Sequence, residues 1–155
     1  MARITDQKRI DRLKESTMKL VVAHGFGGAS VSLIANDANV ASGYFYLHYK
    51  GKYEMVNTLL QDVYQEVVGK LEELTEKGSN FNSIIENLIR HFFQIANNDP
   101  VKLKFLYVLT HDYSFVIDKE MRENINMLIQ NIKEQGHASG ELDKMLNEDD
   151  IYLCV

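Results

Sequence analysis

Hydrophobic positions recur at helical spacing in the first part of the chain. The spacing predicts an amphipathic helix over residues 5–24. Gly25 is suited to end it, because glycine readily takes the left-handed conformation that follows many helices. The apolar side of this helix is expected to carry Ile10, Leu13, Leu20, Val21 and His24.

Two short helices are predicted next. Ser30 precedes a short apolar segment and is expected to cap the first of them. Asn39 suits a left-handed turn position, and Ser42 is expected to cap a second short helix that extends to about His48. Gly51 separates these helices from the rest of the chain.

A long helix is predicted from Lys52 to about Lys77, with Gly78 and Ser79 at its end. Its apolar stripe comprises Met55, Leu59, Val63, Val67, Leu71 and Leu74. Further helices are predicted over residues 80–97, 100–112 and 116–135.

Turn residues mark the breaks between these later helices. Asp99 is expected to cap the helix that Pro100 begins, because proline is tolerated in a first turn. Gly136 and Gly140 are expected to bracket a loop, and Asn147 to cap a final helix near the end of the chain.

Composition favours a helical protein. One proline and nine glycines are too few for a sandwich or barrel of many short strands. No apolar run reaches the roughly 18–20 residues that cross a bilayer, and Asp6, Asp11 and Lys19 argue against a cleavable signal peptide. One cysteine, Cys154, excludes a disulfide framework, so we expect a cytoplasmic protein with no metal and no cofactor.

Charge is unevenly distributed along the chain. The net charge is −5, yet residues 1–52 hold eight basic and four acidic side chains, a net of +4. The other 103 residues hold nine basic and eighteen acidic side chains, a net of −9. A basic head on an acidic body indicates a head that meets a polyanion. Ordinary scatter of surface charge is the alternative.

The three helices predicted within the first 48 residues have the layout of a helix-turn-helix. Small and apolar residues would let the last two cross closely: Ile34, Ala35, Ala38, Val40, Phe45 and Tyr49. Ser42, Gly43 and Tyr44 begin the third helix, where side chains and backbone N–H groups can face a DNA groove. A compact helical subdomain that binds no DNA would have the same apolar inner face.

Residues 25–55, GFGGASVSLIANDANVASGYFYLHYKGKYEM, resemble the N-terminal DNA-binding domain of TetR/AcrR-type bacterial transcriptional regulators. The resemblance covers about residues 9–56. Its matching positions are Gly25, Ser30, Val31, Ile34, Ala35, Ala38, Val40, Gly43, Tyr46, Tyr49 and Lys52. It implies an all-α protein, with a three-helix DNA-binding domain at 1–52 linked by a long helix to an effector-binding and dimerisation domain at 53–155.

The resemblance also implies which residues contact DNA. Ser42, Gly43 and Tyr44 would lie nearest base edges in the major groove, and Ser32 would reach an edge or a phosphate. The implied contacts to the DNA backbone are Ser30, Tyr46, His48 and Lys52.

Each of these roles has a structural alternative. Ser30 and Ser42 can serve as helix caps, and Tyr46 and Tyr49 can pack on the first helix with only a hydroxyl free. The chain also departs from the family pattern, because Tyr44 is bulkier than the small residue that is common there. We therefore expect Tyr44 to alter which bases are read.

Large apolar side chains are frequent in residues 80–135. An aromatic cavity there would suit a lipophilic effector, and its candidate lining residues are Phe92, Phe105, Tyr107 and Tyr113. A helical core produces the same spacing and is the alternative. Family members usually continue through two further long helices that pair in a dimer, so we expect a C-terminal domain that is truncated or dimerises differently.

Catalysis is not predicted. The five histidines show no i, i+4 pair and no neighbouring ligand at metal spacing. The sequence favours a transcriptional repressor that binds a palindromic operator as a homodimer and is released by a small lipophilic effector. The alternative is a helical small-molecule-binding or protein-interaction module that no longer binds DNA specifically.

Overall fold

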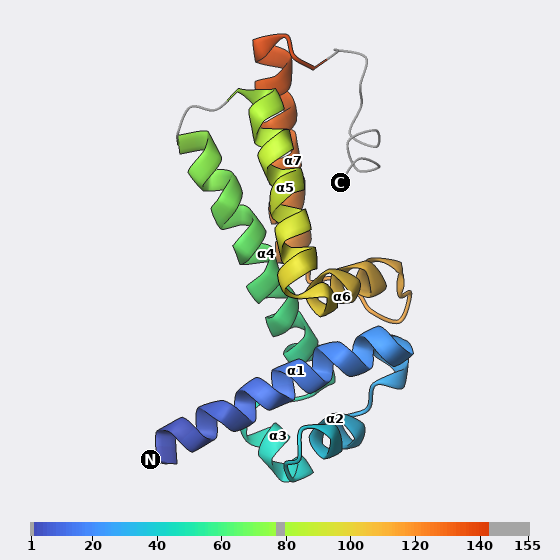
Figure 1. Cartoon of the computed structure of the whole chain (residues 1–155). Helices are drawn as coiled ribbons and strands as arrows, with labels where there is room; N and C mark the ends of the chain where they lie inside the picture. The colour runs from blue at the N-terminus through green and yellow to red at the C-terminus, as the bar shows by residue number, and fades with distance from the viewer. Residues whose placement is uncertain (1, 77–79, 143–155) are drawn as a thin grey trace. The chain divides into compact units, whose positions relative to one another are not determined.

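The computed structural model describes residues 2–76 and 80–142. Over these ranges the chain is helical with no strand, which confirms the predicted all-α class (Figure 1). The helices are α1 (Ala2–Gly28), α2 (Val31–Asp37), α3 (Ser42–His48), α4 (Lys52–Glu76), α5 (Phe81–Asn98), α6 (Pro100–His111) and α7 (Lys119–Ser139). In the described ranges, no helix has the length and apolar character needed to span a membrane. The predicted final helix after Asn147, and Cys154, lie outside them.

The chain divides into two compact units. The head unit contains the residues up to Tyr64 together with Gln94–Val116, and the body unit contains Gln65–Phe93 and the residues from Ile117 onward. Two helices, α4 and α5, therefore contribute to both units. The functional division at residue 52 stays a prediction, because compactness does not assign a function to either part.

In the head unit, α1 lies along α2 and also contacts α6, while α2 packs on α3 (Figure 1). Each helix of the unit contributes at least one buried apolar side chain, and burial of a large one contributes about 1.5–3 kcal/mol. These side chains include Leu13, Val21, Ile34, Phe45, Met55, Leu59, Ile95 and Phe105. The two short helices α2 and α3 are thus stabilised by a core to which all the helices of the head unit contribute.

In the body unit, an apolar cluster joins α4, α5 and α7. Leu71, Leu74 and Ile84 are buried there. Leu88, Leu128 and Ile132 pack against them. Of the stripe predicted on α4, only Val67 is half-buried rather than buried.

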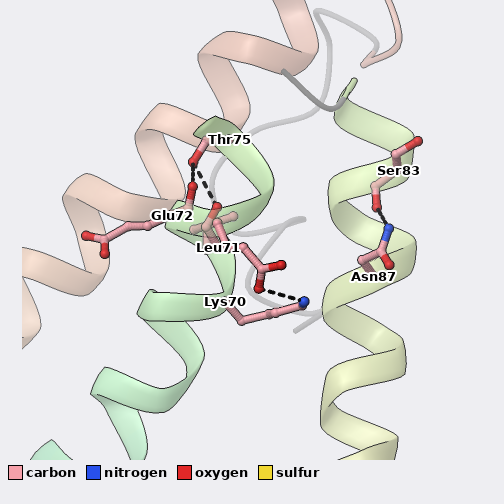
Figure 2. Close-up of polar contacts among 7 residues, drawn as sticks. Lys70, Leu71, Glu72, Thr75, Ser83 and Asn87 are labelled. Carbon is pink, nitrogen blue, oxygen red and sulfur yellow. Dashed lines mark hydrogen bonds and ion pairs between the residues drawn. The ribbon is translucent and has the colours of Figure 1, made fainter. Parts of the chain in front are cut away.

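Polar contacts in this part of the body unit are mostly local. Lys70 pairs with Glu73 at 2.9 Å. Asn87 donates to the Ser83 carbonyl at 2.8 Å, a bond drawn in Figure 2. Thr75 likewise donates to carbonyls of the preceding turn (Figure 2). All of these bonds join residues three or four apart on one helix, so they support single helices while the apolar cluster holds the helices together.

Several predicted helix ends are confirmed. Ser30 caps α2 by accepting a hydrogen bond from the Leu33 N–H at 3.2 Å. Asp99 caps α6 by accepting from the Lys102 N–H at 3.3 Å. Asn39 has a φ of 53° and so occupies the left-handed turn position expected of it.

Other predicted ends are wrong. Ala41 is the residue before α3, and Ser42 is already inside the helix, because the Ala41 carbonyl accepts the first bond, from the Tyr44 N–H at 2.9 Å. Helix α7 begins at Lys119, not at residue 116, since the chain through Phe115 is held in a turn by a bond from its N–H to the Asp112 carbonyl.

Gly136 does not begin a loop, contrary to prediction. Helix α7 continues through it and ends at Gly140, whose φ is 72°. A Cβ at Gly136 would lie 2.8 Å from the Phe81 ring. Glycine is therefore needed there for the close approach of α5 to α7, which a sequence pattern alone does not distinguish from a helix stop.

The end of α1 combines a confirmed break with an unpredicted extension. Gly25, with φ 71° and ψ 171°, interrupts the helix as expected, but one further helical turn continues to Gly28. His24 is exposed and does not belong to the apolar side, so the buried stripe of α1 ends at Val21.

Candidate nucleic-acid interface

A tight turn sets the crossing of α2 and α3. The Asn39 N–H donates to the Asn36 carbonyl at 3.0 Å, and the Val40 N–H donates to the Ala35 carbonyl at 2.9 Å. Asn39 tolerates its left-handed backbone better than most residues do, which lets the chain reverse within this short span. The turn thus positions α3 with one side on the core.

Helix α3 has a buried side and an exposed side. Phe45 is completely buried and its ring lies 5.6 Å from that of buried Tyr49. Tyr46 is 58% exposed and Leu47 78% exposed. We call the exposed side the α3 outer face; it comprises Ser42, Gly43, Tyr46, Leu47 and His48. The alternative in which Tyr46 packs on the first helix is therefore wrong.

Leu47 is a further candidate for DNA contact, which the sequence pattern did not single out. Two residues along a helix rotate a side chain by about 200°, so the buried position of Phe45 places Leu47 on nearly the opposite side. Recognising Phe45 as core was therefore sufficient to find it. An exposed leucine on this helix can make apolar contacts with thymine methyl groups.

Tyr44 is held by α1. Its hydroxyl donates to the Asp6 carbonyl at 3.1 Å and also to the Asp6 carboxylate. Its ring lies 4.8 Å from the His48 ring, and the Arg9 guanidinium lies 5.6 Å from its centroid. Burial, and then the bond to Asp6, raise the pKa of Tyr44 to about 12. The hydroxyl is thus engaged within the head unit, and the expected base contact of Tyr44 stays a prediction.

Lys52 is directed toward the end of α1. Its ammonium donates to the Phe26 carbonyl and to the Gly27 carbonyl, the latter at 3.4 Å, and it lies 4.3 Å from the centroid of the Phe26 ring. Burial lowers the pKa of Lys52. The side chain therefore has a clear structural role, and its expected contact with phosphate stays a prediction.

Asp112 completes a polar group that we call the α1-end clip (Phe26, Lys52, Asp112 and Ser114). One carboxylate oxygen of Asp112 accepts from the Phe26 N–H at 2.6 Å. The other accepts from the Ser114 N–H at 2.9 Å and from its hydroxyl at 2.5 Å. The bonds from Ser114, followed by that from Phe26, hold the pKa of Asp112 below its usual range. The clip fixes the last turn of α1 to the loop after α6.

Aromatic rings pack beside the clip. The Phe115 ring lies 5.1 Å from Phe26 and 5.6 Å from Tyr53. The Tyr53 hydroxyl donates to the Val116 carbonyl at 2.9 Å. Tyr53 thus helps to hold the loop after α6.

The two serines of α2 differ in their freedom. Ser30 is the helix cap, and its hydroxyl lies 3.1 Å from that of Ser32. Both side chains are exposed. Ser32 is not needed as a cap, so its hydroxyl can turn toward an external acceptor.

Residues 14–59 match the family model described as "Bacterial regulatory proteins, tetR family". This segment is therefore a TetR-family helix-turn-helix domain, and it contains α2, α3 and the turn between them.

Longer similarities extend beyond the TetR-family helix-turn-helix. The fatty acid metabolism regulator protein of Bacillus subtilis (strain 168) is 24% identical over 141 residues, which cover 86% of this chain and 70% of that protein. A TetR family transcription regulator from Marinobacter aquaeolei VT8 has a TM-score of 0.74 at 23% identity, covering 94% of this chain and 76% of that one. The regulator FadR from Bacillus subtilis in complex with stearoyl-CoA has a TM-score of 0.61 at 22% identity, covering 89% and 76%.

The candidate effector residues lie in different surroundings. Phe105 is completely buried in the head unit, and Phe92 is half-buried in the body unit. Tyr107 is 65% exposed and Tyr113 is fully exposed. The two tyrosines line one open depression of about 430 Å³ near the C-terminal end of α6. The burial of Phe105 assigns it to the core, and the effector role of all four stays a prediction.

Proposed function

We propose that this chain is a transcriptional repressor that binds duplex DNA through the α3 outer face. The observation that supports this most directly is the exposure of Tyr46 and Leu47 on a helix whose other side is buried. A Cβ at Gly43 would meet nothing within 4 Å, so the start of α3 leaves space for a close approach to base edges. In this proposal Ser42 and Tyr44 lie near base edges as well.

The proposed contacts with the DNA backbone surround this face. Hydroxyl and imidazole groups donate to phosphate oxygens without reading sequence, which suits the exposed side chains of Tyr46 and His48. Ser32 is proposed to donate at the edge of α2, and Ser30 to contribute through the cap that it forms. For Lys52, contact with a phosphate requires that its ammonium first break its hydrogen bonds to the Phe26 and Gly27 carbonyls.

We infer that the active form is a homodimer on a palindromic operator. Two recognition helices must lie about 34 Å apart to enter successive major grooves of one DNA face. Exposed apolar side chains support association of the body unit, since Ile89 and Phe93 lie four residues apart on α5 and are 49% and 66% exposed. Light scattering in the presence of operator DNA would measure the stoichiometry.

A lipophilic effector is proposed to release the DNA, with long-chain acyl-CoA as the first class to test. Support comes from the fatty acid metabolism regulator among the relatives and from the structural neighbour in complex with stearoyl-CoA. Phe92, Tyr107 and Tyr113 are the accessible aromatic candidates for contact with it. An effector that binds the DNA-free form more tightly would shift the population away from the operator.

Fluorescence-anisotropy titration of the full chain tests this proposal. The labelled DNA is the region upstream of its own gene, compared with a random duplex at two salt concentrations, with stearoyl-CoA or with coenzyme A alone. We expect binding to the operator to be at least about 10³-fold tighter than to random DNA. Stearoyl-CoA should reverse it, and coenzyme A should not.

A matched pair of variants connects the result to α3. Leu47→Ala should weaken binding to the operator while leaving binding to random DNA unchanged. Val116→Ala, which removes a side chain of similar exposure in the head unit, should change neither. Equal, salt-sensitive binding of the unaltered chain to both duplexes would instead favour a helical module that no longer binds DNA specifically.

A further inference from the structure

The cations of α1 fall into two groups. Lys14 pairs with Asp62 and Lys19 with Asp37, each at 2.8 Å. Among the side chains that the structure describes, three further cations lie nearer the start of the helix, and these, Lys8, Arg9 and Arg12, are exposed. Within the described residues none of these three forms an ion pair. We call these three residues the α1 basic edge.

The acids near the α1 basic edge accept from neutral donors. The Asp6 carboxylate accepts from the Tyr44 hydroxyl. The Asp11 carboxylate accepts from the Gln7 amide at 2.8 Å. These bonds bring no positive charge, so the carboxylates are engaged while the neighbouring cations stay exposed to solvent.

The members of the α1 basic edge share one side of the helix. At about 100° per residue, they fall within an arc of about 100°, and the exposed acids Asp11 and Glu15 lie outside it. Arg9 fixes the direction of this arc, because its guanidinium lies over the ring of Tyr44 on α3. The basic edge therefore has Arg9 beside the recognition helix, and Figure 1 shows the early turns of α1 passing close to α3.

We propose that the α1 basic edge binds the phosphate backbone of the DNA beside the groove that α3 enters. The inference rests on the proposed function and assigns to α1 the contacts that neutralise phosphate. Lys52 donates instead to the carbonyls of Phe26 and Gly27, so the exposed cations next to α3 are those of the edge together with Lys50, which follows the helix. Arginine suits this role since its guanidinium can donate to two phosphate oxygens at once.

The bond from Tyr44 to Asp6 prepares this surface for binding. It ties α1 at Asp6 to the first turn of α3. A surface that is ordered before binding loses less conformational entropy when it meets the phosphates.

The test is the salt dependence of DNA binding for two double variants. Lys8→Gln/Arg12→Gln removes two charges of the edge and keeps good helix-forming residues. Lys104→Gln/Lys119→Gln removes the same charge from exposed positions on α6 and α7. Both are titrated with the upstream DNA and with random DNA between 50 and 300 mM salt, and circular dichroism checks that each is folded.

The edge variant should bind both duplexes about tenfold or more weakly at low salt, with the slope of log K against log salt lower by about 2 per protomer. The control should keep the slope of the unaltered chain. An unchanged slope in the edge variant, or an equal loss in the control, would overturn the inference.

Failure of the proposed function would be visible separately. If the unaltered chain does not distinguish the upstream DNA from random DNA, the repressor proposal fails. Random DNA still reports whether the α1 basic edge supplies the phosphate contacts, because that measurement needs no operator.

Discussion

The two ends of α1 use the same kinds of side chain in opposite ways. At the start, Arg9 and Arg12 are exposed and the helix is tied down by the neutral hydroxyl of Tyr44. At the end, charged Lys52 and Asp112 both bond to backbone groups of Phe26. The cations at the start of α1 are thus exposed to solvent, whereas the charged side chains at its end bond to the backbone. Residue type alone therefore does not reveal whether a charged side chain serves binding or folding.

The difference predicts how each end responds to substitution. Removing a partner from a half-buried backbone group leaves that group unsatisfied and costs about 1–3 kcal/mol of stability. Removing an exposed, unpaired cation costs little stability and acts on binding alone. Variants at the end of α1 should therefore be seen in unfolding, and variants at its start in DNA binding.

Gly25→Ala should have the largest effect on the end of α1. With φ 71° and ψ 171°, Gly25 has a backbone that only glycine adopts easily, and a Cβ there would lie 3.0 Å from an Asp112 carboxylate oxygen. We expect a loss of about 2–3 kcal/mol in the free energy of unfolding, measured by urea denaturation. Gly43→Ala is the control, and should gain about 0.5–1 kcal/mol in an uncrowded helical position. Equal effects at the two glycines would contradict the strain argument.

Asp112→Ala should come next. It removes the acceptor of the Phe26 N–H and both bonds from Ser114. The expected loss is about 2 kcal/mol in urea denaturation. Asp118→Ala is a suitable control, because Asp118 precedes α7 without a side-chain bond to its N–H groups. A loss as large in the control would show that the clip contributes nothing specific.

The same variant predicts a dependence on pH. The bonds to Asp112 hold its pKa below the ordinary value of 3.8. A lowered folded-state pKa gives stability that is present above the ordinary value and lost as pH falls through the lowered one. The difference in unfolding free energy between the unaltered chain and Asp112→Ala should therefore shrink below about pH 4. A difference that stays constant down to pH 2 would exclude the ionised carboxylate as its source.

Lys52→Met tests the division between structure and binding directly. It removes the bonds to the α1 carbonyls and the cation above the Phe26 ring, at an expected cost of about 1 kcal/mol in unfolding. The salt slope of DNA binding should stay unchanged. A slope lower by about 1 would mean that the ammonium turns outward to a phosphate when DNA is bound.

Local signals in the sequence were sufficient for most of the head unit. The cap at Ser30, the left-handed turn at Asn39 and the break at Gly25 each depend on the chemistry of one residue, and all three are confirmed. Gly136 was misjudged because its reason is tertiary. The absence of a side chain at Gly136 allows Phe81 of α5 to approach α7 closely. The sequence of α7 by itself cannot indicate this contact, because Phe81 lies on another helix.

The candidate site was predictable only in part for the same reason. Exposure of Tyr46 and Leu47 follows from burial of Phe45 in a periodic helix. The bonds of Tyr44 to Asp6 and of Lys52 to Phe26 join residues 38 and 26 positions apart, so no local pattern indicates them. Those contacts decide which polar groups remain free for DNA.

The smallest effect is expected for Tyr44→Phe, near the start of α1. Burial and the bond to Asp6 raise the pKa of Tyr44 to about 12. The stability that the protonated hydroxyl contributes is therefore fully present below the ordinary pKa of 10.0 and is lost as pH rises through 12. Ultraviolet titration should show a tyrosine ionising near pH 12 that Tyr44→Phe removes. The phenylalanine keeps the ring beneath Arg9 but releases Asp6, so we expect a loss of under about 1 kcal/mol in stability and a modest, sequence-independent loss of DNA affinity. A changed base preference in Tyr44→Phe would instead mean that the hydroxyl leaves α1 to read a base.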